Sequence, residues 1–272
     1  MVNIVETLQP NSSLESKYIQ SANTLFHFTD QREYLENMLE ARRLSPRYVI
    51  EDMKYLDFPM FEESAIPMTC FCDIKLHSII EHTSFYGEFG IGFKKELLIQ
   101  KGIQPIHYLN ENSPFTKDFK EELKSLLDET LKIPEMNQDY ILKKLFYTKP
   151  IQGEMWDKRI GKNINKIFHD ENEWRYVPEN IQKYKFKPII PVGKHEPIQD
   201  RVYRNKLNKV LFEHEELSLN FEFKDIRYLF VRNEDECSKL IQFIFNKLDV
   251  SNIDKGNLIA KIQVVENIKE DY

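Results

Sequence analysis

The sequence is poor in cysteine and glycine and has no long hydrophobic run. Its three cysteines among 272 residues are an odd number, which does not make a disulfide framework. No stretch approaches the roughly 18 apolar residues that a membrane-spanning helix needs. The segment from Met1 to Pro10 contains Glu6 and no basic residue, so it lacks the charged start and apolar run of a signal peptide. These absences predict a cytoplasmic protein that does not contact a membrane.

Motifs that hold phosphate groups or activate a serine nucleophile are also absent. There is no Walker-type glycine loop and no Gly-x-Ser-x-Gly elbow. Gly90-Ile91-Gly92 is too short to be a dinucleotide fingerprint. The net charge of −6 argues against a protein that coats nucleic acid over its whole surface, and leaves only a local basic patch open.

The sequence does contain enough apolar material for a substantial core, at 41% of its residues. Thr29 and Asp30 are both candidate caps for a helix after them, and Asp30 lies three residues before Glu33, the spacing of a capping box. Asp73 is a candidate cap for a second helix. Strands and helices do not alternate strictly, so we predict an α+β fold with a mixed sheet core and flanking helices. The predicted strands are 24–28, 66–71, 104–109, 173–177, 217–223 and 226–231, and further helices are predicted at 94–101, within 111–148 and at 236–248.

Three short segments place polar or ionisable groups beside aromatic residues at the edges of predicted strands. They are Leu25–Thr29, Phe85–Phe93 and Asp170–Tyr176. Three of the eight glycines of the chain fall between Gly87 and Gly92, which predicts a turn or bulge that leads into a strand. These segments contain all the candidate catalytic and NAD-binding residues discussed below.

Five motifs follow one another along the chain: His27-Phe28-Thr29, Pro46-Arg47-Tyr48, Cys70-Phe71-x-Asp73-Ile74, Tyr86-Gly87-x-Phe89-Gly90-Ile91-Gly92-Phe93 and Glu171-x-Glu173-Trp174-Arg175-Tyr176. Their order resembles the AbiGi family of abortive-infection (phage-defence) proteins. The resemblance spans about residues 24–178, and 179–272 is predicted to form a C-terminal strand-strand-helix extension of a single domain, 1–272. The family resemblance implies an antitoxin-like role beside a nucleotidyltransferase-type toxin, through contact with that toxin or with its RNA target.

A weaker resemblance is to the His-Tyr-Glu arrangement of ADP-ribosyltransferases, which implies catalytic roles for His27, Tyr86 and Glu173. Tyr86 would stack on the nicotinamide of NAD, and His27 would hydrogen-bond the adjoining ribose. Glu173 would stabilise the positive ribose in the transition state. The residues expected to bind NAD are His27, Phe28, Thr29, Tyr86 and Phe89. The sequence departs from that family at Trp174-Arg175, and it leaves open whether the protein is an enzyme.

Each of these residues also has a purely structural interpretation. Glu171 and Glu173 share one strand face, and Glu173 can form an ion pair with Arg175, two residues further on the same face. His27 alternates with Phe26 and Phe28 along its strand and can be a hydrogen-bonded structural histidine. Tyr86 can pack around the glycine turn.

Metal binding and nucleic-acid binding have weaker signals. Cys70 and Cys72 lie near His77 and His82, but no second pair of ligands follows at the spacing of a zinc site, so no metal is predicted. Buried free thiols are the preferred interpretation. Basic residues cluster in three groups, of which the third, with Tyr203 among it, is a candidate contact for RNA or an acidic partner. The groups are Arg42, Arg43 and Arg47; Lys183, Lys185 and Lys187; and Arg201, Arg204, Lys206 and Lys209.

Overall fold

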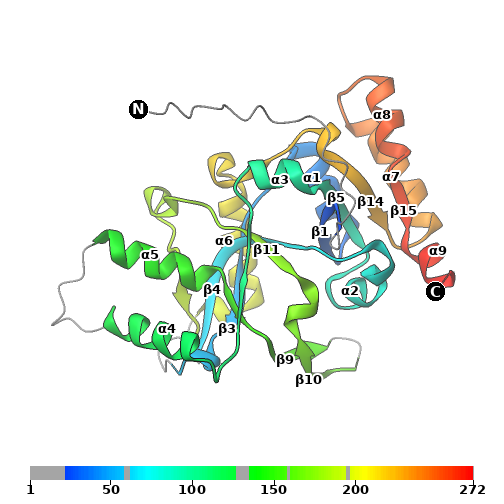
Figure 1. Cartoon of the computed structure of the whole chain (residues 1–272). Coiled ribbons are helices and arrows are strands. Elements are labelled where there is room, and N and C mark those ends of the chain that lie inside the picture. Colours follow the sequence, from blue (N-terminus) through cyan, green and yellow to red (C-terminus); the bar gives the residue numbers. More distant parts are fainter. Residues whose placement is uncertain (1–21, 58–61, 127–134, 158–159, 194–196, 272) are drawn as a thin grey trace, which may run out of the picture.

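A mixed sheet forms the centre of the protein in the computed structural model, which describes residues 22–57, 62–126, 135–157, 160–193 and 197–271 (Figure 1). Its strand order is β15-β14-β5-β1-β4-β11-β6, and β3 and β12 also pair with β4. The β14–β15 pair is parallel and the other pairs are antiparallel. The strands are β1 (Thr24–Thr29), β3 (Arg47–Asp52), β4 (Glu63–Cys72), β5 (Phe89–Lys94), β6 (Gln104–Pro105), β11 (Glu173–Tyr176), β12 (Ile190–Pro191), β14 (Ile226–Val231) and β15 (Ile262–Val264).

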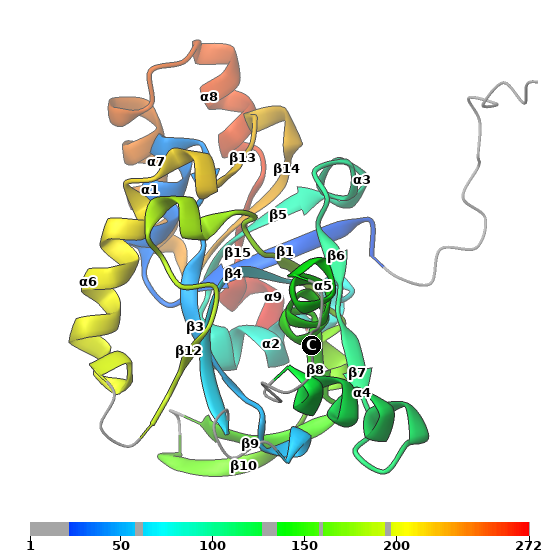
Figure 2. The ribbon, with the colours of Figure 1, turned by 90° about the vertical axis from the view of Figure 1, so that its left-hand side faces the viewer.

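Among the described residues, three two-stranded sheets lie outside this path. They pair β2 (Arg43–Leu44) with β13 (Leu219–Asn220), β7 (His107–Leu109) with β8 (Thr148–Pro150), and β9 (Gln152–Asp157) with β10 (Lys162–Ile167). The β9–β10 pair lies at one end of the molecule (Figures 1 and 2). A two-stranded ribbon has few partners of its own, so its position depends on what it packs against.

Helices surround the sheet, and α6 runs beside β3 on a different side from α4 and α5 (Figure 2). Their apolar faces pack on the strands as their periodicity requires. Their bounds are α1 (Arg32–Ala41), α2 (Ile79–Tyr86), α3 (Lys95–Gln100), α4 (Pro114–Ser125), α5 (Glu135–Phe146), α6 (Arg201–Phe212), α7 (Glu234–Lys247), α8 (Asn252–Ile259) and α9 (Val265–Glu270).

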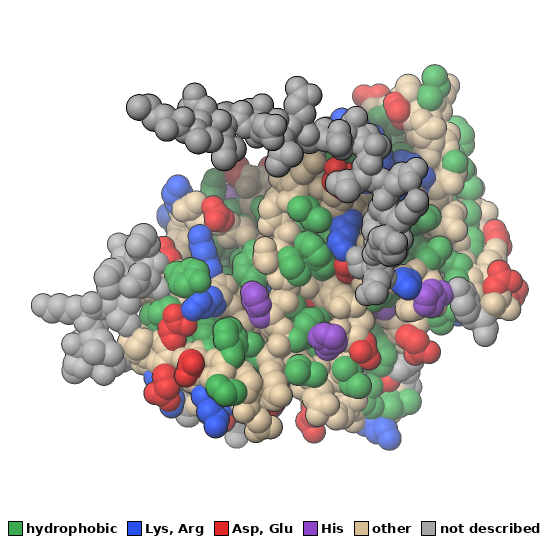
Figure 3. Space-filling view, viewed as in Figure 1, with side chains coloured by type: hydrophobic (Ala, Val, Ile, Leu, Met, Phe, Trp, Pro, Cys, Tyr) green, Lys and Arg blue, Asp and Glu red, His purple; other side chains and the backbone are tan. Residues whose placement is uncertain are grey.

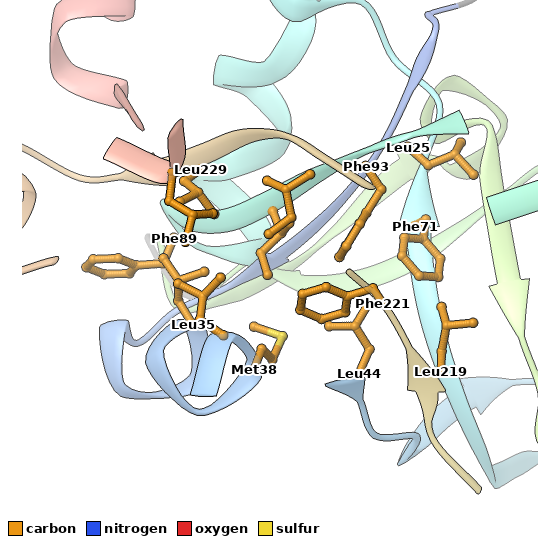
Figure 4. Close-up of a cluster of buried hydrophobic side chains, with 14 of the residues drawn as sticks. Leu25, Leu35, Met38, Leu44, Phe71, Phe89, Phe93, Leu219, Phe221 and Leu229 are labelled. Carbon is orange, nitrogen blue, oxygen red and sulfur yellow. The ribbon is translucent and has the colours of Figure 1, made fainter. Parts of the chain in front are cut away.

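The largest core cluster lies between the sheet and the helices α1 and α7 (Figure 4). Leu25 of β1 and Phe93 of β5 point into it, together with Leu35 of α1 and Leu229 of β14. The neighbour of Leu25 on β1, Phe26, joins a second cluster on the opposite face with Phe230 of β14. The alternation of a strand therefore gives β1 two buried faces, which holds it in the middle of the sheet.

The predicted fold class is confirmed, and most predicted elements are present with shifted ends. The two predicted helix caps are wrong. The N-cap of α1 is Gln31 without a side-chain hydrogen bond, because α1 begins one residue later than a cap at Asp30 requires. Asp73 forms an ion pair with Lys95, and the α-helix after it begins only at Ile79.

One predicted strand in the C-terminal part is shorter than predicted. Only Leu219–Asn220 of the predicted strand 217–223 pairs as a strand, because 3₁₀ turns at Glu215–Leu217 and Phe223–Asp225 flank it. A reciprocal capping box between Glu222 and Asp225 fixes the second turn. The segment predicted as an extension also contributes β14 and β15 to the central sheet, where β14 pairs with β5.

The glycines of β5 make room for the aromatic side chains of β1. A Cβ atom at Gly90 would lie 2.6 Å from a ring carbon of Phe28, and one at Gly92 would lie 3.1 Å from the ring of Phe26. The predicted glycine-rich turn is confirmed at Gly87, which has a φ of +111° between α2 and β5. These glycines therefore set how closely α2 and β5 approach β1.

Replacement of Gly87 by alanine is expected to lower the free energy of unfolding by at least about 2 kcal/mol, because the backbone conformation is strained for any L side chain. The added Cβ would also lie 2.1 Å from the Thr29 carbonyl oxygen. The control is Gly256→Ala in α8, where the added Cβ would meet nothing within 4 Å beyond the helix's own backbone and the neighbouring residues, and alanine should stabilise the helix by up to about 1 kcal/mol. Urea unfolding of both variants measures the two effects, and equal midpoints would contradict the prediction.

Candidate functional site

A cavity of about 500 Å³ lies where β1, β3 and β4 approach α2 and the β9–β10 ribbon. Its lining includes three aromatic side chains from β1, β4 and the turn before β11, namely Phe28, Phe71 and Phe168. All three residues predicted to be catalytic, His27, Tyr86 and Glu173, line it as well. The remaining lining residues are Phe26, Val49, Ile50, Glu51, Asp52, Lys54, Glu63, Cys70, Cys72, His82, Lys149, Pro150, Glu154, Met155, Trp156, Asn163 and Glu171.

His27 lies where β1 and β4 separate. The two strands share one register pair, Phe26 with Cys72. Past this pair, the His27 Nδ1 atom donates a 2.8 Å hydrogen bond to the Cys70 carbonyl. The imidazole N–H thus binds a carbonyl that a backbone N–H would bind in a regular strand pair. Burial lowers the pKa of His27, although the hydrogen bond to the Cys70 carbonyl acts to raise it. The neutral imidazole thus has Nδ1 as donor and Nε2 as acceptor.

Tyr86 ends α2 with its ring near that of His82, at a centroid distance of 4.5 Å. Its hydroxyl donates a 2.6 Å hydrogen bond to Oε1 of Glu171. The Lys166 ammonium group lies 4.5 Å from the centre of the Tyr86 ring, a cation–π distance. Burial raises the pKa of Tyr86, so the phenol stays protonated and acts as a donor.

Glu173 forms part of a buried chain of ion pairs. Arg175, which has no exposed surface, donates from Nε to Oε1 of Glu173 at 2.6 Å and from Nη2 to Oε2 of Glu51 at 2.8 Å. The Lys149 ammonium group lies 2.9 Å from the other Glu173 oxygen, Oε2. The predicted pair between Glu173 and Arg175 is confirmed, and both Glu173 oxygens are occupied.

Glu171 extends the same chain of charges. It lies in the 3₁₀ turn Phe168–Glu171 and forms an ion pair with Lys166 of β10. Its second oxygen lies 3.7 Å from the Lys149 ammonium group. Lys149 therefore contacts both glutamates and joins the two halves of the chain.

The pKa values of these groups follow from burial and pairing. Burial by itself would raise the pKa of Glu171 and of Glu173. The neighbouring cations outweigh burial, so both pKa values are lowered: Lys149 and Lys166 act on Glu171, and Arg175 and Lys149 act on Glu173. Burial would lower the pKa of Lys149, but the glutamates outweigh it and raise that pKa well above its usual value. Three carboxylates (Glu51, Glu171, Glu173) thus face three cations (Lys149, Lys166, Arg175), and the pairing favours the charged forms of Glu171, Glu173, Lys149 and Arg175.

The residues predicted to bind NAD separate into two groups. His27, Phe28 and Tyr86 line the cavity, whereas Thr29 and Phe89 are not among its lining residues. Thr29 and Phe89 are instead a register pair of β1 and β5, and the Phe89 ring is buried in the main core. Sequence reasoning missed Glu51, Lys149 and Lys166, which lie on β3, β8 and β10 and carry no local motif.

The cysteine and histidine residues considered for a metal have other surroundings. Burial raises the pKa of the Cys70 and Cys72 thiols well above its usual value. Burial also lowers the pKa of His82 to about 4. In the described ranges no group of three or more His, Cys, Asp or Glu side chains has an arrangement that could hold a metal ion.

On the face shown in Figure 3, lysines, arginines, acidic and hydrophobic side chains are interspersed. Several members of the three basic groups have partners within the protein. Arg43 pairs with Glu215, and Arg47 lies over the ring of Tyr34. Arg204 turns back to donate to the Ile198 carbonyl at 2.9 Å. The remaining basic side chains of α6 are exposed, and Tyr203 among them is 46% exposed.

None of the helices in the described part of the chain combines the length and the apolar character that crossing a membrane requires.

Comparison with known proteins gives matches over most of the chain. Residues 42–232 match a family model described as "Putative abortive phage resistance protein AbiGi, antitoxin". A protein of Lactococcus lactis subsp. cremoris, "Abortive phage resistance protein AbiGi", is 35% identical over 254 residues, which cover 84% of this chain and 98% of the relative. No solved structure matches the chain significantly.

Proposed function

Because the chain belongs to the AbiGi family of abortive phage resistance proteins, we propose that it is the antitoxin-like component of a two-protein phage-defence system. The observation that carries this proposal is the match of residues 42–232 to a family model whose description includes the word antitoxin. The proposed action is contact with a second protein, the toxin, or with the RNA target of that toxin. We further propose that this toxin is of the nucleotidyltransferase type that the family resemblance implies.

The chemistry of the cavity supports a role in binding. A carboxylate that stabilises a developing positive charge needs an oxygen that faces the reacting atom. Both oxygens of Glu173 already accept from Arg175 and Lys149. Glu171 accepts from Tyr86 and pairs with Lys166 through Oε1, and its Oε2 lies 3.7 Å from the Lys149 ammonium group. These carboxylates are held as parts of the wall, in an arrangement that suits a rigid binding surface.

The exposed face of α6 is where the predicted contact with RNA would lie. Val202 and Tyr203 are exposed there beside Lys206 and Lys209. Cations next to an aromatic ring suit a phosphate backbone with unstacked bases. The net charge of −6 limits such binding to a local contact, so we rank RNA second to a protein partner.

A growth experiment tests the proposed function. A nucleotidyltransferase-type toxin from the same host, expressed alone, is expected to arrest growth, and co-expression of this chain is expected to restore it. The chain expressed alone should leave growth unchanged, because contact with the partner is its proposed action. Growth arrest by this chain alone would overturn the antitoxin proposal. Charge reversal at Lys206 and Lys209 separates the two routes, since it should remove only a contact with RNA.

A second candidate function is that of an NAD-dependent ADP-ribosyltransferase-like effector. One observation favours it, namely that His27, Tyr86 and Glu173 line a single cavity. The ion pairs of Glu173 oppose it. In the same strains, NAD concentration should fall when the wild-type chain is expressed and stay constant with Glu173→Gln. Equal NAD concentrations with the wild type, the variant and an empty vector would remove this candidate.

A further inference from the structure

The mouth of the cavity carries an excess of negative charge that no described cation balances. The inner wall is neutral, because Glu51, Glu171 and Glu173 face Lys149, Lys166 and Arg175. Three further carboxylates line the cavity where the wall becomes exposed or half-buried, namely Asp52, Glu63 and Glu154. Only Lys54 accompanies them among the described lining residues, at 3.7 Å from Asp52. The mouth thus keeps two uncompensated carboxylates.

Two of these carboxylates face each other across a strand pair. Asp52 and Glu63 are directly opposite in the β3–β4 register. Like charges at opposed positions destabilise a sheet. In the described part of the chain Glu63 forms no ion pair, and Glu154 has only a long 3.5 Å hydrogen bond from Asn163. This arrangement costs stability in the free protein, and a bound cation would offset that cost.

An exposed tryptophan lies at the same mouth. Trp156 lines the cavity although 58% of its surface is exposed, and Glu154, two residues earlier on β9, points to the same side of the ribbon. A tryptophan face attracts a guanidinium or ammonium group, and nearby carboxylates attract the same charge. The cavity of about 500 Å³ behind it has room for the whole of a long side chain.

We propose that this cavity receives a basic side chain, an arginine or lysine, from the partner protein. Its head group would lie between Trp156 and the carboxylates of Glu63 and Glu154. An acidic mouth repels phosphate, so a nucleotide or an RNA backbone fits this site poorly. Proteins that act on nucleotides hold phosphates with arginine and lysine, which gives such a partner the basic side chains required. The inference rests on the proposed antitoxin function for the identity of the partner, and on the cavity alone for the chemistry of the ligand.

The first test uses a small probe on the full-length protein. Calorimetric titration with acetyl-Gly-Arg-Gly-amide is expected to show binding that weakens as salt increases. The isosteric citrulline peptide, which lacks the charge, should bind at least about tenfold more weakly, a difference of about 1.4 kcal/mol. Agmatine is titrated in parallel, because a free cation is the other source of the same chemistry.

Variants locate the binding. Glu63→Gln with Glu154→Gln should weaken the arginine peptide by about tenfold or more, and Trp156→Ala should weaken it further. The control pair Glu40→Gln with Glu213→Gln removes two exposed carboxylates outside the cavity lining and should leave the affinity unchanged. Urea unfolding of the Glu63/Glu154 variant should keep or raise the midpoint, since the opposed charges are relieved.

The growth assay then connects the site to the partner. Loss of toxin neutralisation in the Glu63/Glu154 variant, with neutralisation kept in the control pair, is the expected result. If the arginine peptide does not bind, the inference about the cavity is overturned. Neutralisation of the toxin by the wild type would still support the proposed antitoxin function in that case. Agmatine binding more tightly than the peptide, with neutralisation intact in the variant, would reassign the cavity to a free cation and also overturn the partner assignment.

Discussion

Replacement of Arg175 by methionine is expected to lower the free energy of unfolding by about 3 to 5 kcal/mol, the cost of leaving buried charges without their partner. The Arg175 guanidinium group donates to Glu173, Glu51 and the Phe146 carbonyl, and none of its surface is exposed. Methionine fills much of the volume of the arginine side chain. The decrease in the free energy of unfolding therefore measures mainly the lost charge and hydrogen bonds, and only to a small extent a cavity left in the core. Urea unfolding at neutral pH measures it.

A double-mutant cycle separates the pair from the rest of the network. Glu173→Gln in the Arg175→Met background removes one of the stranded carboxylates, so it should recover about 1 to 3 kcal/mol of the loss. Arg201→Met, at an exposed position on α6, is the control and should change stability by less than about 0.5 kcal/mol. A loss at Arg175 no larger than that of the control would show that the ion-pair chain contributes nothing.

Stability is also expected to fall as the pH drops from about 6.5 towards 4.5, because His82 is held neutral in the folded protein. Burial lowers the pKa of His82 to about 4, against an ordinary value of 6.5. Below pH 6.5 the unfolded chain takes up the proton first, so the stabilisation present above that pH is lost towards the folded pKa. The lowered pKa of His27 acts in the same direction.

The size of this effect is about 1 to 2 kcal/mol between pH 7 and pH 5 for His82, allowing for its partial exposure. His82→Phe keeps a ring beside Tyr86 and Phe28 but cannot take up a proton, so its profile should be flatter by that amount. His107→Gln, at an exposed position, should keep the wild-type slope. Parallel profiles for the wild type and His82→Phe would refute the assignment.

The acidic branch of the same profile reports different groups. The pKa values of Glu171 and Glu173 are lowered in the folded protein, so their stabilisation is present above the unfolded value of 4.5 and is lost below it. The pH range in which the histidines lower the stability and the range in which the glutamates lower it meet near pH 4.5. Measurements between pH 5 and pH 7 therefore isolate the histidines from the carboxylates.

Local patterns were sufficient for several features of this protein. The alternation Glu173-Trp174-Arg175 places two charges on one strand face, and the predicted ion pair follows from the geometry of any strand. The glycines between Gly87 and Gly92 predicted a special backbone and a strand after it. The ordered motifs predicted the family, to which the matches over residues 42–232 assign the chain.

The partners of those local features come from distant parts of the chain. Glu51 lies 124 residues before Arg175, and Tyr86 lies 85 residues before Glu171. Lys149 stands in a three-residue strand and Lys166 on an exposed ribbon, and neither position has a periodicity that sets it apart. The capping predictions for Asp30 and Asp73 were wrong because the ends of helices depend on the neighbouring packing as well as on the spacing of residues.

The sequence by itself determined the fold class, the family and the residue types around His27, Tyr86 and Glu173, because periodicity and motifs are properties of neighbouring residues. Its shortage of cysteine and glycine already left little room for disulfides or a phosphate-binding loop. Only the tertiary structure decided that these residues share one cavity, that the Glu173 carboxylate is neutralised on both oxygens, and that the mouth is acidic beside Trp156. The physical reason is that a charge acts through whatever lies within a few ångströms of it, and here folding brings those groups together from β3, β8, β9, β10 and β11.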